Sequence, residues 1–133
     1  MTGYESEIKG LLYRLGANTK YYGFAHTVHC VEEMLYNKEA RECIKIAYIS
    51  AQKRFNTDNY NIERDIRTMV RAIWESGNRD LLHEIAGQHL ETRPKAKEFL
   101  NILTEYVLKE YVGSDLAVQE AAVTRQPEGR AIN

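Results

Sequence analysis

The chain has 133 residues, 44% of them hydrophobic, and a net charge of −1, which is the size and composition of one globular domain that builds its own core. The near-neutral charge argues against a protein whose whole surface attracts nucleic acid. The N-terminal segment MTGYESEIKG lacks the basic and apolar regions of a secretory signal, and no apolar run reaches the about 20 residues that span a bilayer. We therefore expect a cytoplasmic protein that has no membrane partner.

Apolar residues at helical spacing predict two helices in the first third of the chain, over residues 6–15 and 24–36. Gly16 is a natural stop for the first of them. A third helix is predicted to run without a break over residues 38–55. Its inward side is predicted to consist of Cys43, Ile44, Ala47, Tyr48, Ala51 and Phe55.

The polar sequence NTDN, residues 56–59, predicts a turn and a helix N-cap. A fourth helix is predicted to follow over residues 60–76 and to end at Gly77. The buried side of this helix is predicted to consist of Ile62, Ile66, Met69, Val70, Ile73 and Trp74.

The last part of the chain predicts a short helix that is capped by Asn78 and runs to Ile85, and a long helix over residues 95–111. No segment has the alternation of a strand, so the predicted fold class is all-α. We expect a compact bundle of about six helices in residues 1–111 and a flexible C-terminal tail over residues 112–133.

The segment AYISAQKRFNTDNYNIERDIR has the pattern of a helix-turn-helix. Ala51 is small where two helices must approach each other closely, and Ile62 and Ile66 can anchor the second helix on the first. The residues that then point outward are Tyr60, Asn61, Glu63, Arg64, Arg67, Thr68 and Arg71. The alternative is an ordinary helical hairpin with a solvated, charged face.

Charge supports the first interpretation. Of the three segments 1–44, 45–71 and 72–133, only the one from Lys45 to Arg71 has an excess of basic residues. Its charged residues are the basic Lys45, Lys53, Arg54, Arg64, Arg67 and Arg71 and the acidic Asp58, Glu63 and Asp65. Arginine can grip a phosphate or contact guanine O6 and N7 together, glutamate can accept from cytosine, and asparagine can pair with adenine. We predict that bases are read by Tyr60, Asn61, Glu63, Arg64 and Thr68. We predict that phosphates are contacted by Lys53, Arg54, Arg67 and Arg71.

A second cluster, AHTVHC, places His26, His29 and Cys30 on one helical face, a spacing compatible with zinc. No fourth ligand is apparent, so we expect a histidine cluster in the packing or on the surface, with no metal and no cofactor. Cys30 and Cys43 are predicted to be free, buried thiols. The chain has no phosphate loop, nucleophile motif or paired carboxylates, so we expect no enzyme.

Three stretches together resemble a known family: IKGLLYRLGANTKYYGF, MLYN and AQKRFNTDNYNIERDIRTMVRAIWESGN. They are similar to the C-terminal DNA-binding effector domain of the sporulation master response regulator, stage zero sporulation protein A, over residues 8–108. The resemblance implies a six-helix domain with its recognition helix in the major groove of double-stranded DNA. It also implies control of transcription through short tandem boxes, on which neighbouring copies of the protein touch as a dimer.

The resemblance implies that Glu63 and Arg64 read bases, because they match family positions with that role. Arg67 matches an arginine that the family keeps on the same helix. Tyr60 and Asn61 depart from it, since the family usually has a small polar residue and an arginine there, so we expect a different DNA box. The loop over residues 87–99 is also shorter than usual. The chain has no room for the family's phosphorylated receiver domain, so we expect an excised effector domain or a free-standing relative.

Two other functions compete with this one. A protein-interaction module could keep the scaffold and either sequester a related regulator or contact RNA polymerase through the acidic C-terminal segment, residues 72–133. A small metalloenzyme built on His26, His29 and Cys30 is the remaining alternative.

Overall fold

The computed structural model describes residues 3–113, and within that range the chain is helical with no strand. The α-helices are α1 Glu5–Leu15, α2 Tyr22–Tyr36, α3 Lys38–Glu42, α4 Ile44–Phe55, α5 Asn59–Ser76, α6 Arg79–Ala86 and α7 Ala96–Val107. A π-helical turn, η1 Leu108–Val112, extends α7. The predicted all-α class is confirmed, while most of the predicted tail lies outside the described residues.

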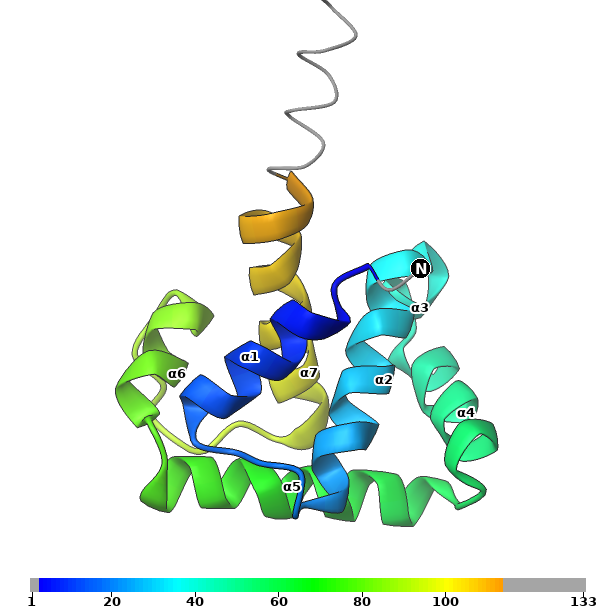
Figure 1. Cartoon of the computed structure of the whole chain (residues 1–133), viewed down its shortest axis with the longest axis horizontal. Coiled ribbons are helices and arrows are strands. Elements are labelled where there is room, and N and C mark those ends of the chain that lie inside the picture. The colour runs from blue at the N-terminus through cyan, green and yellow to red at the C-terminus, as the bar shows by residue number, and fades with distance from the viewer. Residues whose placement is uncertain (1–2, 114–133) are drawn as a thin grey trace, which may run out of the picture.

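Helix α5 lies along the bottom of the molecule in the view of Figure 1, and the other helices pack above it. Helices α2 and α7 rise from its middle, α4 lies at its N-terminal end and α6 at its C-terminal end. The most extensive contact between helices is that of α2 with α5. Five residues of α5 are completely buried beneath the other helices: Ile62, Ile66, Met69, Val70 and Ile73.

The prediction of one unbroken helix over residues 38–55 is wrong. Cys43 has φ −138° and ψ 94°, which ends α3 and starts α4 in a new direction. The Asn37 side chain caps α3 at the Glu39 N–H, and Arg41 donates from Nη1 to the carbonyl oxygens of Met34 and Leu35, 2.9 Å each. These bonds tie the short helix to the end of α2 and turn the chain.

The prediction that both cysteines are buried is right for one and wrong for the other. Cys30 is buried, and its burial raises the pKa of the thiol to about 12. Cys43 is exposed, because it lies at the bend between α3 and α4 and not on an inward helical face.

Trp74 was also expected in the buried side of α5, but it is only partly buried. The Arg79 guanidinium lies 4.1 Å from the centroid of its ring, and His83 meets the ring edge-on at 5.8 Å. Arg79 also donates from Nε and Nη2 to the Trp74 carbonyl oxygen. Trp74 therefore closes the corner between α5 and α6 at the edge of the core.

Two close backbone approaches hold α5 in place. A Cβ atom on Gly77 would lie 2.5 Å from the carbonyl oxygen of Leu15, at the end of α1. A Cβ atom on Gly23 would overlap the carbonyl oxygen of Asp65, because α2 begins where it crosses α5. Gly77 ends α5 as predicted, but in an extended conformation with φ −96°, so the close approach to α1 explains this glycine.

Candidate nucleic-acid interface

Helices α4 and α5 form the predicted helix-turn-helix. Asn56 ends α4 in the left-handed conformation, with φ 52° and ψ 54°, a backbone geometry that asparagine tolerates better than most residues. Asp58 then caps α5, since its Oδ1 accepts from the Asn61 N–H at 2.8 Å. Ala51 and Ile62 are completely buried between the two helices. The polar turn and N-cap are therefore confirmed.

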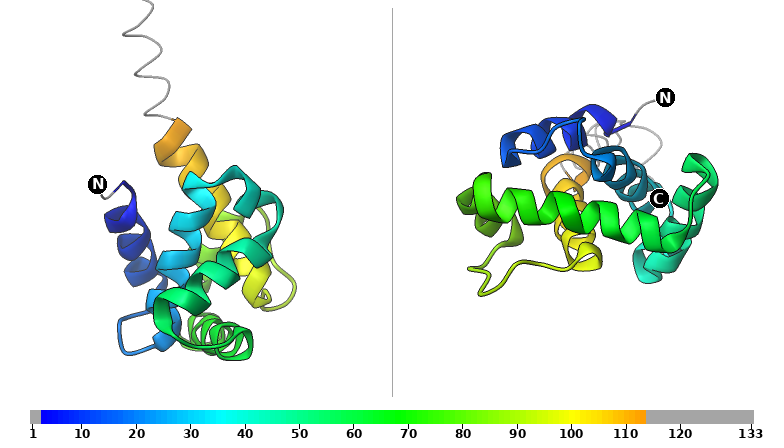
Figure 2. Two further views of the ribbon diagram at one scale, coloured as in Figure 1. Left: turned by 90° about the vertical axis from the view of Figure 1, so that its right-hand side faces the viewer. Right: turned by 90° about the horizontal axis from the view of Figure 1, so that it is seen from below.

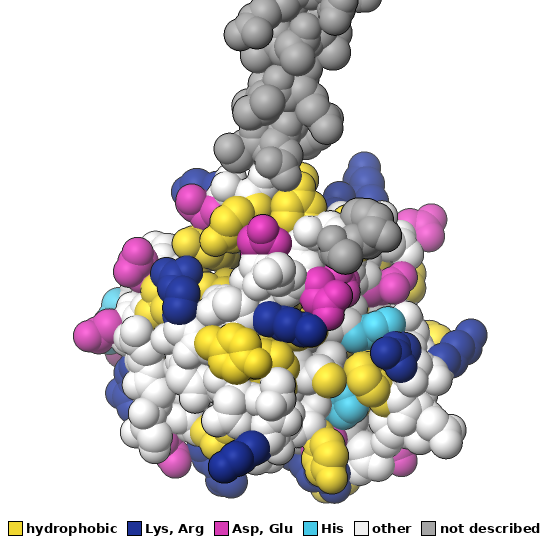
Figure 3. Space-filling view, viewed as in Figure 1, with side chains coloured by type: hydrophobic (Ala, Val, Ile, Leu, Met, Phe, Trp, Pro, Cys, Tyr) yellow, Lys and Arg dark blue, Asp and Glu magenta, His cyan; other side chains and the backbone are white. Residues whose placement is uncertain are grey.

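The outer side of α5 crosses one whole face of the molecule with no other helix over it (Figure 2, right). The predicted base-reading residues that are exposed on this face are Tyr60, Arg64 and Thr68. All four predicted phosphate residues are exposed too: Lys53, Arg54, Arg67 and Arg71. Basic side chains also project along the lower edge of the face seen in Figure 3, the edge that α5 forms. A groove of nucleic acid could therefore approach α5 without displacing another helix.

Two of the predicted base-reading residues lie deeper than expected. Glu63 and Asn61 are only partly exposed. The Asn61 side chain turns back to the preceding turn, where its Nδ2 donates to Thr57 Oγ1 at 3.1 Å. Asn61 therefore braces the turn in this structure, and its outward orientation was predicted incorrectly.

The loop before α7 adds basic side chains that the sequence interpretation missed. A hollow of about 300 Å³ is lined by Tyr60, Arg64, Arg67, Thr68, Arg71 and Arg93. A neighbouring hollow of about 410 Å³ is lined by Glu63, Arg67, Arg93, Pro94, Lys95 and Ala96. The loop runs beside α5 in the right-hand view of Figure 2. Arg93 and Lys95 are exposed and therefore extend the basic surface of α5 sideways.

Arg93 and Lys95 are visible in the sequence as the basic cluster RPK, residues 93–95. This cluster lies far along the chain from the helix-turn-helix. Only the packing of α7 against α5 brings the cluster next to Arg67. Pro94 is buried and Lys95 is the N-cap of α7, so the loop is anchored at its end.

Most of the arginines on this surface are free of acidic partners. Within residues 3–113, Arg67, Arg71 and Arg93 have no carboxylate within 4.0 Å, whereas Arg64 pairs with Asp65 at 3.0 Å. Guanidinium groups that are not neutralised by the protein can bind phosphate oxygens through charge-assisted hydrogen bonds. The surface is therefore suited to a polyanion.

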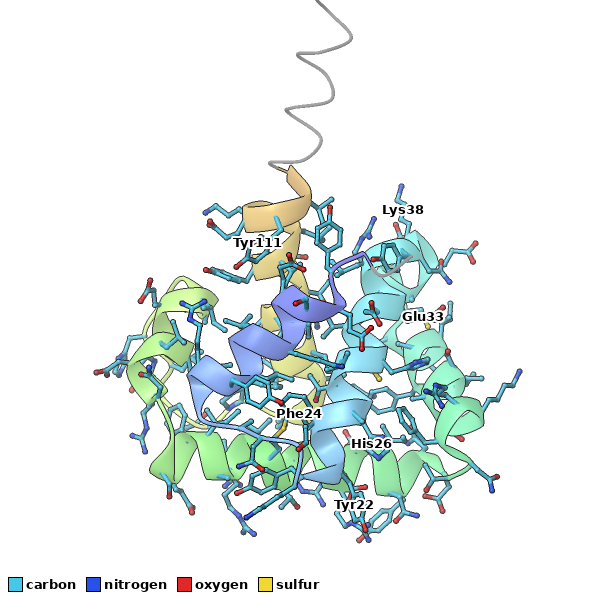
Figure 4. All side chains as sticks on the ribbon, viewed as in Figure 1. Tyr22, Phe24, His26, Glu33, Lys38 and Tyr111 are labelled. Atoms are coloured by element: carbon cyan, nitrogen blue, oxygen red, sulfur yellow. The ribbon has the colours of Figure 1, made fainter. Side chains whose placement is uncertain are left out.

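Tyr22 is a further residue that the sequence interpretation left out. It is 77% exposed, and it projects from the start of α2 below α5 (Figure 4). Tyr60 is also highly exposed, at 65%. Tyrosine hydroxyls often donate to phosphate oxygens at protein–DNA interfaces, so Tyr22 belongs to the candidate surface.

The family resemblance agrees with this geometry. The family model described as the sporulation initiation factor Spo0A C terminal matches residues 8–107. The chain belongs to this family. Spo0A C-terminal domains are DNA-binding effector domains of sporulation response regulators and are not an enzyme family. The predicted resemblance is thus confirmed over nearly the range that was expected for it.

The match to the Spo0A C-terminal family extends from α1 to the end of α7. It therefore includes the helix-turn-helix and also the loop that carries Arg93 and Lys95. Within the part of the chain that the structure describes, no helix is long and apolar enough to cross a membrane.

The histidine and cysteine side chains of α2 make contacts within the protein. His26 Nε2 lies 3.2 Å from Asp65 Oδ2, His29 Nε2 lies 2.8 Å from Ser50 Oγ, and Cys30 Sγ lies 3.9 Å from the Ala47 carbonyl oxygen. Burial lowers the pKa of both histidines. Among the described residues, no three such side chains are grouped to hold a metal ion.

Proposed function

We propose that this chain is a sequence-specific, DNA-binding transcription regulator that inserts α5 into the major groove of double-stranded DNA. The observation that carries the proposal is the uncovered outer face of α5, where Arg64, Arg67 and Arg71 are exposed. A recognition helix of this motif meets base edges with its first turns, while later residues contact the backbone. Residues 1–111 would act as one DNA-binding unit.

The proposed base-reading residues are Tyr60, Asn61, Glu63, Arg64 and Thr68. Arg64 is the main candidate for a bidentate contact with guanine O6 and N7. Glu63 lies in the hollow that Arg93 and Lys95 also line, so it would read a base beside a held phosphate. Asn61 would contact a base after its hydrogen bond to Thr57 breaks, or would affect base reading by holding the shape of the turn.

The proposed phosphate contacts are Lys53, Arg54, Arg67 and Arg71. Three further residues of the candidate surface are proposed to contact phosphates as well: Arg93, Lys95 and Tyr22. Lys53 and Arg54 end the supporting helix, and Arg93 and Lys95 lie beside the recognition helix. Contacts from both sides would fix the register of α5 on the duplex. We further propose that neighbouring copies bind tandem boxes as a dimer, and that RNA polymerase is a partner on that DNA.

One specific observation favours a second function. The Asn61 amide is engaged with Thr57, and the family's usual arginine is absent at this position. The same scaffold could then serve as a protein-interaction module that sequesters a related regulator.

Selection of bound duplexes from a random DNA pool tests the two functions. We expect a consensus box and a binding constant whose logarithm falls linearly with the logarithm of salt concentration, because phosphate contacts release counterions. A chain that selects no consensus but binds a related regulator would support the interaction module. Arg64→Ala is the matched variant, and it should select a relaxed box.

A further inference from the structure

We infer that Asp65 is a positioning residue that holds the guanidinium of Arg64 for end-on contact with a guanine, and that His26 holds Asp65. This inference rests on the proposed function, and it assigns the specificity of the recognition helix to a pair of residues that no base would touch. Three observations carry it: the geometry of Arg64 with Asp65, that of Asp65 with His26, and the crossing of α2 over α5.

The first observation is that one carboxylate oxygen occupies the side of the Arg64 guanidinium. Arg64 Nε and Nη2 lie 3.3 and 3.0 Å from Asp65 Oδ1. A guanidinium has five N–H donors, so this contact leaves both donors of Nη1 and one of Nη2 free. Two of those donors, one on Nη1 and one on Nη2, form the end of the fork, which can make a bidentate contact with O6 and N7.

Arg64 has a second restraint in Tyr60, one turn earlier on the same helix. The Arg64 Cζ atom lies 5.8 Å from the centroid of the Tyr60 ring, within the range of a cation–π contact. The carboxylate thus fixes one edge of the guanidinium and the ring restricts one of its faces. An arginine held in this way loses less conformational freedom when it binds a base.

The second observation is that Asp65 is itself held by a buried group. Its Oδ2 lies 3.2 Å from His26 Nε2, and His26 is only 6% exposed. An ionised carboxylate is an acceptor, so Nε2 is assigned as the donor. The His26 ring packs edge-on against Phe55 with the ring centroids 4.6 Å apart. The imidazole therefore cannot move away from Asp65 without disturbing the end of α4.

The third observation is the crossing of α2 over α5. Gly23 allows the start of α2 to touch the backbone of Asp65 and Ile66. His26 follows one turn later on α2, as the label in Figure 4 shows, and so reaches the Asp65 side chain. The direction of Arg64 is consequently set by the core contact between α2 and α5.

The expected consequence is a change in specificity that is larger than the change in affinity. Without Asp65, Arg64 keeps its charge but gains freedom to contact phosphates, which carry no sequence information. Preference for guanine at one base pair should then fall, while binding to other sequences is retained. Removing an exposed carboxylate elsewhere on α5 should not change the preference for guanine.

The experiment compares the full chain with Asp65→Ala, the isosteric Asp65→Asn, Arg64→Ala and the double variant. Glu75→Gln is the charge-matched control, since Glu75 is exposed on the same helix. Each protein is titrated with the selected box and with three boxes that replace one guanine. We expect Asp65→Ala to reduce the guanine preference roughly 10-fold, Asp65→Asn to reduce it less, and Glu75→Gln to leave it unchanged.

In the Arg64→Ala background, Asp65→Ala should cause no further loss of preference, because Asp65 acts through Arg64. A parent-like preference in folded Asp65→Ala or Asp65→Asn would overturn the inference and leave the proposed function standing. An equal loss in the absence of Arg64 would also overturn it, because Asp65 would then act alone. A parent chain that selects no box would overturn the proposed function as well.

Discussion

The backbone N–H of Asn78 donates to the carbonyl oxygen of Leu15 over 2.9 Å, which joins the end of α1 to the end of α5. The approach is possible because Gly16 and Gly77 face each other: a Cβ atom on Gly16 would lie 2.9 Å from the Gly77 Cα. The C-terminal end of the proposed recognition helix is therefore fixed by a helix from the other end of the chain.

We expect Gly77→Ala to destabilise the domain by about 1–3 kcal/mol, because its Cβ would meet the Leu15 carbonyl oxygen at 2.5 Å. Urea unfolding followed by circular dichroism measures the loss. Gly10→Ala is the matched control within α1, where an added Cβ meets nothing within 4 Å. It should be neutral or stabilising by up to about 1 kcal/mol. Equal stability of the two variants would contradict the close approach.

The different burial of Ile66 and Trp74 predicts different costs of truncation. Ile66 is completely buried, so Ile66→Ala should cost about 2–5 kcal/mol. Trp74 lies at the corner beneath Arg79, so Trp74→Ala should cost less than the about 3–5 kcal/mol typical of a buried tryptophan. Chemical denaturation measures both. A larger loss for Trp74 than for Ile66 would place the centre of the core at the α5–α6 corner.

The loop residue Arg93 should behave like a phosphate contact. Arg93→Ala is expected to weaken binding similarly for all sequences and to reduce the slope of log K against log salt by about 0.9. Arg71→Ala should act in the same way. Lys109→Ala, on η1, serves as the control that removes one charge away from α5. A changed consensus box in Arg93→Ala would instead make Arg93 a base-reading residue.

The Arg64 side chain should behave differently. Arg64→Ala is expected to cost about 1–3 kcal/mol on the selected box and to relax preference at one base pair. Competition with single-base variants of the box measures both effects. A uniform loss over all sequences would assign Arg64 to the phosphates.

Asn61→Arg should move the selected box toward that of the family. The substitution restores the residue type that the resemblance implies, and it removes the hydrogen bond to Thr57 Oγ1. Selection from random DNA with both chains measures the shift. Thr57→Val removes the same hydrogen bond without adding a charge, and it should leave the box closer to that of the parent. If the parent, Asn61→Arg and Thr57→Val all select the same box, residue 61 does not read a base.

The two histidines on α2 should make stability depend on pH. Burial lowers the pKa of His26 and of His29, so below about 6.5 the unfolded chain binds protons that the folded chain does not. Stability is therefore present above that pH and is lost as the pH falls through the lowered folded values. Urea unfolding at pH 7.5, 6.5 and 5.5 should show this loss. A His26→Gln, His29→Gln double variant should flatten it, and an unchanged pH dependence in that variant would contradict the prediction.

Local patterns in the sequence were enough to predict most helices and the helix-turn-helix itself. The buried positions of α5 repeat at helical spacing, and Asp58 lies where a capping side chain is needed, so neighbours along the chain already specify this helix. The break at Cys43 was missed because it depends on Arg41, whose partners are carbonyl oxygens of the preceding helix. Periodicity alone continues through such a bend.

The sequence by itself determined the family, the all-α class and the row of arginines on α5, because each is written in adjacent or helically spaced residues. Only the tertiary structure decided which residues surround those arginines. Arg93 lines the same hollow as Arg67 because of the docking of α7, and His26 reaches Asp65 through the crossing of α2 over α5. Contacts between residues far apart in the chain depend on how helices pack, and helical spacing carries no information about that packing.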